Sequence, residues 1–306
     1  MLQSLAPTSP VPETAAVPAA EPNPAWRDRF KAGLCGVYKY SGAMSVQEWL
    51  TYAAGRRSVT VLLLHRVTDE IPADGLTVST PWFRRLCRML SSRFRVVPLG
   101  QAVSLLKTPD ALPRRTVAIT FDDCYRDNLK AARILAEHHL PACFFVPTEF
   151  IGTDRVFDWD RHLKPMPNLQ WDDLHEIIRL GHDIGSHTAS HADLGLVDPE
   201  QAERELRDSK KILETRLGCP VRWFAYPFGG RGNFRPEYLP LVHAAGYEAC
   251  FSGYGGSARG SSIGQVIPRE SVPYFRTLIN LELHLSGCLD WFYGLKRRVG
   301  LQPALS

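Results

Sequence analysis

Residues 117–123 read Val-Ala-Ile-Thr-Phe-Asp-Asp, and this stretch decides how the rest of the chain is interpreted. Its first five residues form a short apolar and β-branched run, which is typical of a buried strand. Since successive strand residues face opposite sides of a sheet, the two adjacent carboxylates serve one site only if the strand ends there. Carboxylates at a strand end are where α/β enzymes place their chemistry, although Asp is also common in plain turns.

Predicted strands and helices alternate on both sides of this stretch. Strand patterns cover residues 59–64, 94–98, 117–121, 142–146, 183–185, 223–226 and 248–251. Helix patterns cover residues 81–90, 99–106, 128–139, 171–180, 199–217, 235–245 and about 274–298. The alternation predicts an α/β fold with a mainly parallel sheet and outer helices, and its regularity favours a barrel. No Gly-x-Gly-x-x-Gly follows the first strand, so a dinucleotide site is not supported.

Capping residues mark two of these helices. The clearest helix has Asp198 as its N-cap, Pro199 as its first residue and Gly218 as its stop signal. The helix from residue 81 is expected to use Thr80 as its N-cap. Residues 152–168 and the Gly/Ser-rich residues 253–264 are expected to form loops.

Composition limits the class of protein. The chain has 306 residues, of which 44% are hydrophobic and 22% charged, so it can bury one sizeable core in one large domain. A formal net charge of +4 is too weak to predict nucleic-acid binding. The seven cysteines show no Cys-x-x-Cys spacing, which argues against a disulfide framework and clustered zinc-finger sites.

The ends of the chain differ from its middle. Residues 1–25 are rich in Pro and Ala and lack a basic start followed by an apolar segment, so they are expected to be a disordered tail. No apolar run reaches the length of a membrane span. We therefore expect a cytoplasmic protein with one folded domain over 26–300, of which 270–300 is a helical extension.

Two histidines offer a second chemical signal. His187 and His191 are four residues apart, which places both imidazoles on one face of a helical turn or of a tight loop that resembles one. Two histidines and one carboxylate form a common open metal site for hydrolysis. Two surface histidines in a polar loop would explain the pattern as well, since the spacing alone is a weak signal.

Three motifs occur in one order: Thr-Phe-Asp-Asp at 120–123, His-Thr-Ala-Ser-His at 187–191 and Tyr-Pro-Phe-Gly at 226–229. Together they resemble the polysaccharide deacetylase family, the carbohydrate esterases that share the NodB homology domain. The resemblance covers about residues 59–270. It implies a distorted (β/α) barrel of the NodB type, in agreement with the alternation of elements.

The resemblance also implies roles for residues. Asp123, His187 and His191 would bind a divalent metal, with zinc as the first expectation. Asp122 would be the general base toward the attacking water. Tyr226 and Phe228 would contribute to substrate and oxyanion binding, chiefly through a backbone N–H near Phe228. A plain Pro/Gly loop remains the alternative interpretation of that third motif.

An acid is needed to protonate the leaving amine. The segment 63–67, Leu-Leu-His-Arg-Val, resembles the early histidine motif of the family branch that includes poly-N-acetylglucosamine deacetylases, so His65 is the preferred acid. Many family members instead use a late Leu-x-His motif. Here its nearest match is Leu283-His284, which sits inside a helical pattern and is disfavoured.

Two positions depart from the family pattern. Cys124 stands where the family usually has Gly, and Cys tolerates positive φ poorly. A thiol there could be a small buried hydrophobe, or could be oxidised or join the coordination of a metal. Ala225 stands where many members carry an Arg that pairs with the base. Arg269 could replace that Arg and keep Asp122 ionised, or could form a surface salt bridge.

The sequence thus predicts a metal-dependent hydrolase that removes acetyl groups from the N-acetylated sugars of a glycan, in exopolysaccharide or cell-envelope synthesis. Two alternatives stay open: a deacetylase or deformylase of a lipid-linked or small amino sugar, and a glycan-binding protein without catalysis. Residues 284–298 carry aromatic residues followed by basic ones, which suits peripheral membrane contact or a core-packing helix with a solvated end.

Overall fold

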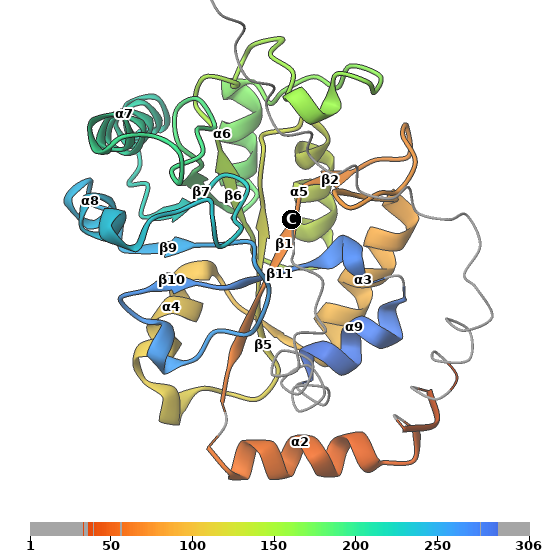
Figure 1. Ribbon diagram of the computed structural model, residues 1–306. Coiled ribbons are helices and arrows are strands. Elements are labelled where there is room, and N and C mark those ends of the chain that lie inside the picture. Colours follow the sequence, from red (N-terminus) through yellow and green to blue (C-terminus); the bar gives the residue numbers. More distant parts are fainter. Residues whose placement is uncertain (1–32, 34–35, 39, 56, 276, 287–306) are drawn as a thin grey trace, which may run out of the picture.

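The computed structural model describes residues 33, 36–38, 40–55, 57–275 and 277–286 (Figure 1). The predicted tail at 1–25 lies outside these residues, as does most of the aromatic and basic segment 284–298. The proposed division of the chain into tail, domain and extension therefore stays a prediction.

Parallel strands form the centre of the molecule. They are β1 (Val59–Leu64), β4 (Arg95–Val96), β5 (Thr116–Phe121), β6 (Cys143–Val146), β7 (Asp183–Ser186), β8 (Trp223–Ala225), β9 (Ala249–Phe251), β10 (Val266–Ile267) and β11 (Arg269–Ser271). Their order is β10-β9-β8-β7-β6-β5-β1-β11, with β4 also pairing with β5.

The sheet curls into a nearly closed barrel. Its two outermost strands, β10 and β11, are separated in sequence only by Pro268, so one short segment pairs with both ends of the sheet. β10 pairs with β9, and β11 pairs with β1. This closure confirms the predicted distorted (β/α) barrel.

Helices surround the barrel (Figure 1). They are α2 (Ala43–Ala53), α3 (Thr80–Arg93), α4 (Leu99–Lys107), α5 (Asp127–Glu137), α6 (Trp171–Arg179), α7 (Pro199–Leu217), α8 (Leu239–Ala244) and α9 (Leu278–Leu285). Short 3-10 turns occur at η1 (Pro109–Ala111), η2 (Asp158–Asp160), η3 (Pro236–Tyr238), η4 (Gly260–Ser262) and η5 (Val272–Tyr274). Among the described helices, none is long and apolar enough to cross a membrane.

Strand side chains alternate between two packed layers. In β5, Val117 and Ile119 join the large cluster that contains most of the outer helices, whereas Ala118 joins a second cluster with residues of α4. The period of two therefore assigns one face of each strand to the helices and the other to the barrel interior. Asp122 lies on the same face of the strand as Ala118 and Thr120, so its side chain points toward the barrel interior.

Several boundaries differ from the sequence predictions. The N-cap of α3 is Ser79, whose hydroxyl accepts from the Trp82 N–H at 3.4 Å, and Thr80 is instead the first helical residue. The helix predicted at 235–245 is divided into η3 and α8, and the final helix begins only at Leu278. The small parallel pair β2 (Arg66–Val67) and β3 (Thr77–Val78) was not predicted, because two residues carry no readable periodicity.

The prediction for α7 is confirmed residue by residue. The Asp198 carboxylate caps the Gln201 N–H at 2.8 Å, and Gly218 ends the helix at φ 68°. Both signals are local in sequence, which is why they could be recognised without the fold.

Candidate metal centre and active site

The two adjacent carboxylates lie where β5 ends. The Asp122 N–H still donates to the Leu64 carbonyl of β1 at 3.0 Å, and Asp123 then turns into positive φ at 76°. The strand therefore ends between them, and both carboxylates reach the same site. Both side chains are buried.

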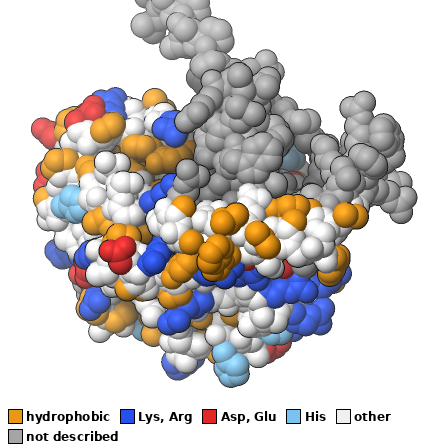
Figure 2. All heavy atoms as spheres, turned by 90° about the horizontal axis from the view of Figure 1, so that it is seen from below, with side chains coloured by type: hydrophobic (Ala, Val, Ile, Leu, Met, Phe, Trp, Pro, Cys, Tyr) orange, Lys and Arg blue, Asp and Glu red, His pale blue; other side chains and the backbone are white. Residues whose placement is uncertain are grey.

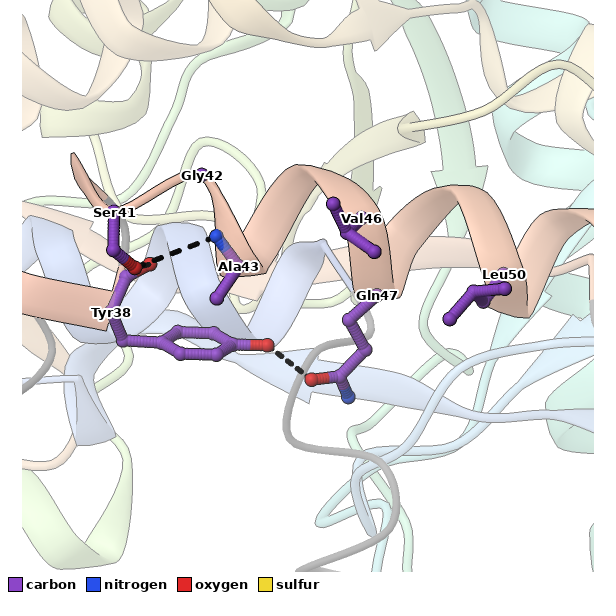
Figure 3. A pocket seen from close by; sticks show the side chains of 7 residues that line it. All are labelled: Tyr38, Ser41, Gly42, Ala43, Val46, Gln47 and Leu50. Atoms are coloured by element: carbon purple, nitrogen blue, oxygen red, sulfur yellow. Dashed lines mark hydrogen bonds between the residues drawn. The ribbon is translucent and has the colours of Figure 1, made fainter.

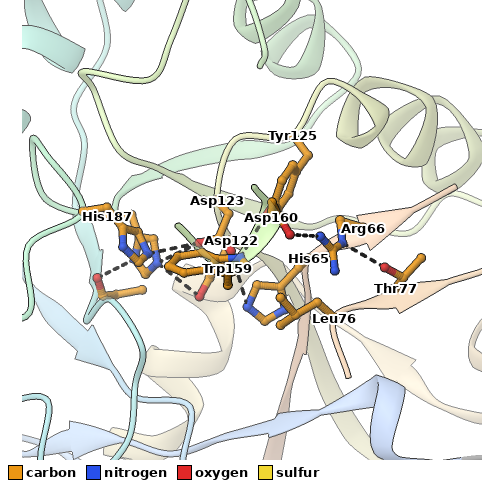
Figure 4. A network of polar contacts seen from close by, with 12 residues as sticks. His65, Arg66, Leu76, Thr77, Asp122, Asp123, Tyr125, Trp159, Asp160 and His187 are labelled. Carbon is orange, nitrogen blue, oxygen red and sulfur yellow. Dashed lines mark hydrogen bonds and ion pairs between the residues drawn. The ribbon is translucent and has the colours of Figure 1, made fainter. Parts of the chain in front are cut away.

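Asp123, His187 and His191 form one cluster. Nε2 of His187 lies 3.4 Å and Nε2 of His191 lies 3.3 Å from Asp123 Oδ1. One possible ligand atom from each residue lies within 4.8 Å of the others, and all three residues are buried. Figure 4 shows His187 and the two carboxylates facing one another.

The chemistry of this donor set fits a divalent metal. Nδ1 of His187 lies 2.8 Å from the Ala225 carbonyl, so it carries the proton and leaves the Nε2 lone pair for a ligand. Burial alone would raise the pKa of Asp123, but the neighbouring His187 and His191 imidazoles hold that pKa well below its usual value. An ionised carboxylate and two imidazole nitrogens are a common set for zinc and related ions.

A loop, not a helical turn, brings the two histidines together. Thr188 has φ 65° and His191 has φ 62°, so the chain reverses between them. The buried carboxylate of Glu205, on α7, accepts from the Ala189 and Ser190 N–H groups at 2.8 and 2.9 Å and from the Ser190 hydroxyl at 2.6 Å. The sequence analysis missed Glu205, since its position in α7 carries no motif.

Arg269 lies against Asp122, as the sequence suggested. Its Nη1 and Nη2 donate to the two Asp122 carboxylate oxygens, each at 2.7 Å. Its Nε donates to the Ser252 carbonyl at 2.7 Å, and its side chain is fully buried. The alternative of a surface salt bridge is therefore wrong. A bidentate pair of this kind fixes the direction of the Asp122 carboxylate.

His65 follows β1 and faces the same cluster (Figure 4). Its Nε2 lies 3.9 Å from Asp123 Oδ2, and its backbone carbonyl accepts from Asn128 Nδ2 at 2.6 Å. Burial lowers its pKa, although Asp123 and Asp122 oppose that shift. His284 lies elsewhere, with Nε2 3.1 Å from Glu270 Oε2.

The third motif forms a strained turn at the edge of the site. Phe228 has φ 62° and is 55% exposed, and its N–H finds no acceptor among the described residues. Gly229 must be glycine, because a Cβ there would lie 2.4 Å from the Gly253 nitrogen. The turn therefore leaves one backbone donor unused next to His191, whose ring centroid is 4.9 Å from that of Phe228.

Tyr226 lies behind the turn, inside the protein. Its side chain is 1% exposed and packs against Phe224 and Phe234, and its N–H already donates to the Phe251 carbonyl at 3.0 Å. Tyr226 therefore packs in the hydrophobic core beneath the turn, and its part in substrate or oxyanion binding stays a prediction.

Trp159 was missed by the sequence analysis, which treated residues 152–168 as an irregular loop. It lies on η2, with its ring centroid 5.3 Å from that of His191 and 5.7 Å from that of Phe228. Its indole Nε1 donates to the Tyr125 hydroxyl at 3.3 Å. Trp159 and Phe228 thus form a partly exposed aromatic rim beside the metal-ligand cluster.

Cys124 adopts a positive φ, the backbone region that favours glycine. Its φ is 66°, and its side chain is fully buried in the main hydrophobic cluster. Burial raises the pKa of its thiol, which disfavours the thiolate needed for coordination or oxidation. The thiol does not belong to the group of possible metal ligands found in the described residues.

The fold and the site define a parallel (β/α) barrel with a two-histidine, one-carboxylate cluster at the carboxyl ends of its strands. A family model described as polysaccharide deacetylase matches residues 110–250, which include the first two motifs and the Tyr-Pro-Phe-Gly turn. Over these residues the chain belongs to the polysaccharide deacetylase family.

Relatives by sequence agree with this family. The chain is 29% identical over 190 residues to YxkH of Bacillus subtilis, which is named as a polysaccharide deacetylase, and the match covers 61% of this chain and 62% of YxkH. It is 29% identical over 119 residues to a chitooligosaccharide deacetylase of Sinorhizobium fredii, covering 37% of this chain and 47% of the relative. The chain thus spans less than two thirds of the length of either relative.

Solved structures show the same fold. The deacetylase PplD of Streptococcus pyogenes superposes with a TM-score of 0.64 at 20% identity, over 75% of this chain and 98% of PplD. IcaB of Ammonifex degensii superposes with a TM-score of 0.61 at 21% identity, over 75% of this chain and 97% of IcaB. At these identities the likeness concerns the fold alone.

Proposed function

We propose that this protein is a metal-dependent deacetylase that hydrolyses the N-acetyl groups of amino sugars in a glycan. The observation that carries the proposal is the buried cluster of Asp123, His187 and His191 beside an Asp122 held by Arg269. Membership of the polysaccharide deacetylase family, and relatives named as polysaccharide and chitooligosaccharide deacetylases, support the choice of substrate.

Asp123, His187 and His191 would hold the ion, and zinc is our first choice for this donor set. When bound, such an ion polarises the acetamide carbonyl and makes an attacking water more acidic. Glycan synthesis in the cell envelope or in an exopolysaccharide is the setting that we propose for this activity.

Each neighbouring residue has a distinct part in this proposal. Asp122 takes the proton of the attacking water, and Arg269 fixes the direction of that carboxylate through its two hydrogen bonds. The unused N–H of Phe228 donates to the oxygen on which negative charge develops. His65, which reaches the cluster from β1, gives a proton to the leaving amine nitrogen.

The aromatic rim supplies a surface for the sugar. Trp159 and Phe228 present exposed ring area next to His191. Aromatic rings pack well against the apolar faces of sugar rings, because those faces carry C–H groups only. We infer that a sugar of the glycan stacks here while its acetamide enters the cluster.

The test is acetate release from chitin oligosaccharides by the zinc-loaded protein, with Asp122→Asn as the variant. We expect at least a hundredfold loss of rate with zinc still bound, because a general base contributes about 10²–10⁴-fold. Asp172→Asn, on the exposed start of α6, is the matched control and should keep full activity. Zinc content and thermal stability are measured for each variant, since Asp122→Asn leaves Arg269 with a weaker partner.

Removal of the metal by a chelator should abolish acetate release, and added zinc should restore it. Release that survives Asp122→Asn would contradict the assigned base. If the zinc-loaded protein bound the oligosaccharides but released no acetate, the glycan-binding alternative would replace the proposal. If it neither bound nor cleaved them, a lipid-linked or small amino sugar would become the substrate to test.

A further inference from the structure

The helix α2 buries its charged residue and exposes apolar residues, the reverse of an ordinary surface helix. Its one charged residue, Glu48, is buried against the body of the protein, where it accepts from Arg115 Nε at 2.8 Å and from Arg114 Nη2 at 3.0 Å. Met44, one turn before it, is buried with Leu283 of α9. The helix is thus attached through the side that carries Met44 and Glu48.

The opposite side of α2 is apolar and exposed. Val46, Trp49 and Leu50 are 60%, 59% and 55% exposed, and their spacing of three and four residues places them on one face. The neighbouring Gln47 carboxamide already accepts a hydrogen bond from the Tyr38 hydroxyl (Figure 3). No charged side chain interrupts this face.

Exposed hydrophobic side chains are concentrated in and just before α2. Ten large hydrophobic side chains are exposed in the described part of the chain, and five of them lie between residues 37 and 50. Figure 2, which views the molecule from below, shows hydrophobic side chains gathered there with Lys and Arg side chains beside them. Contiguous exposed apolar surface of this kind marks an interaction site.

The charge around α2 is positive. Arg57 follows the helix and lies over the Tyr52 ring at 4.5 Å, Arg95 is exposed, and Arg114 is partly exposed. Glu48 pairs with Arg114 and Arg115, and Glu282 pairs with Arg93; both carboxylates are buried and add little exposed negative charge. Asp110 is exposed, and its backbone carbonyl accepts a hydrogen bond from Arg57 Nη1.

We propose that α2 docks the protein on an anionic phospholipid surface. An exposed apolar helix face with Trp, flanked by arginines, matches what a helix lying in the plane of a membrane interface requires. The anionic headgroups attract the arginines, while Val46, Trp49 and Leu50 enter the boundary between headgroups and acyl chains.

A second copy of the chain fits this face less well. An α-helix of 11 residues is about 16 Å long, so one face of it offers far less than the roughly 800 Å² per partner that a stable dimer buries. Arginines would also face arginines across such an interface.

The position of α2 has a consequence for the substrate. It leads directly into β1 and lies at the amino ends of the strands, below the barrel in Figure 1, whereas the metal-ligand cluster lies at the carboxyl ends. A protein docked through α2 holds its site about 20 Å from the surface, given a six-residue strand β1. That geometry favours a glycan chain that extends away from the membrane over a sugar at the lipid headgroup.

The test uses the full chain and vesicles. We expect the protein to sediment with vesicles of mixed phosphatidylglycerol and phosphatidylcholine but not with pure phosphatidylcholine, and to be released by high salt. The double variant Val46→Glu/Leu50→Glu should lower the partition coefficient at least tenfold, and Glu keeps the helix because its helix propensity is high. Leu196→Glu, at a residue that is 79% exposed away from α2, is the matched control.

A second variant tests the charge. Arg57→Gln/Arg95→Gln should weaken sedimentation and reduce its dependence on salt. No sedimentation of the unaltered protein, or sedimentation indifferent to Val46→Glu/Leu50→Glu, would overturn the proposal. So would a dimer in solution, seen by sedimentation velocity, that the same double variant dissociates. Acetate release from soluble oligosaccharides is expected to stay unchanged, which keeps this test independent of the proposed activity.

Discussion

Five of the seven non-glycine residues with positive φ in the described part of the chain lie at the candidate site. They are Asp123, Cys124, Thr188, His191 and Phe228. Each such conformation costs on the order of 1 kcal/mol or more and persists only where neighbouring contacts impose it. Two of the three metal-ligand candidates, Asp123 and His191, have such a backbone, and Thr188 directly follows the third. The direction of these side chains therefore depends on contacts with other parts of the protein.

Glu205 supplies such contacts for the histidine loop, and Glu205→Ala tests its importance. Three hydrogen bonds from residues 189 and 190 would be lost, so we expect zinc affinity to fall about tenfold or more. Isothermal titration calorimetry on the metal-free protein measures the change. Glu203→Ala, at an exposed position of the same helix, is the control; equal affinities in the two variants would show that the loop needs no such support.

Substitutions of Trp159 test whether the aromatic rim binds the sugar. Trp159→Ala should raise KM for chitin oligosaccharides about tenfold with a smaller change in kcat, because a ring that stacks on the sugar without touching the reacting atoms mainly affects binding. Steady-state kinetics at fixed zinc give both constants. Trp159→Phe should restore most of the affinity, and Val156→Ala in the same loop should change neither constant. A loss confined to kcat would contradict a stacking role.

At the scale of elements, the loop 152–168 depends on a buried ion pair. Arg66 of β2 is fully buried, with Nη1 2.5 Å from Asp160 Oδ1 and Nη2 2.9 Å from Asp74 Oδ2. The second oxygen of Asp160 accepts from the Tyr125 hydroxyl at 2.5 Å. The small β2–β3 pair, the end of β5 and η2 are thereby joined beside the metal-ligand cluster (Figure 4).

Asp160→Ala should therefore destabilise the protein by about 3 kcal/mol, because it leaves Arg66 buried with one carboxylate fewer. Urea unfolding of the metal-free protein gives the free energy, and limited proteolysis locates the opened loop at 152–168. Asp158→Ala removes an exposed carboxylate two residues away and should cost under about 0.5 kcal/mol. A loss of under 1 kcal/mol in Asp160→Ala would mean that Asp74 suffices for Arg66.

At the scale of the whole molecule, the Asp127 carboxylate, which connects α5 to β2, makes the stability of the protein depend on pH. Asp127 begins α5, and its Oδ2 accepts from the Val67 N–H of β2 at 3.1 Å. Burial raises its pKa to about 7, although Asn128, Val67, Arg66 and Lys130 oppose the shift. The folded form thus holds this proton more tightly than the unfolded form, so stability falls as pH rises from about 4 to about 7.

Asp127→Asn should remove that fall. Between pH 4 and pH 7.5, the unfolding free energy of the variant should rise by about 2 kcal/mol relative to that of the unaltered protein. The full pKa shift would correspond to roughly 4 kcal/mol, and contact of the carboxyl with water reduces this value. Urea unfolding at several pH values, with chelator present throughout, measures the difference between the two proteins. A difference that stays constant with pH would contradict the raised pKa of Asp127.

Much of the fold could be predicted because its signals are local. The caps of α7, the apolar run of β1 and the end of β5 each depend on a few consecutive residues. The small β2–β3 pair and the division of residues 235–245 could not be predicted. Both depend on contacts between segments, and short elements have too few residues to show a period.

The sequence by itself determined the barrel and the chemistry of its motifs: two carboxylates at a strand end and two histidines four residues apart. Only the tertiary structure decided that Arg269 pairs with Asp122 across 147 positions of sequence, that Glu205 and Trp159 lie beside the histidines, and that the Tyr226 side chain is buried. It also decided that α2 turns its apolar side outward. The physical reason is that residue types reveal what a side chain can do, whereas its direction and burial are set by partners distant in sequence.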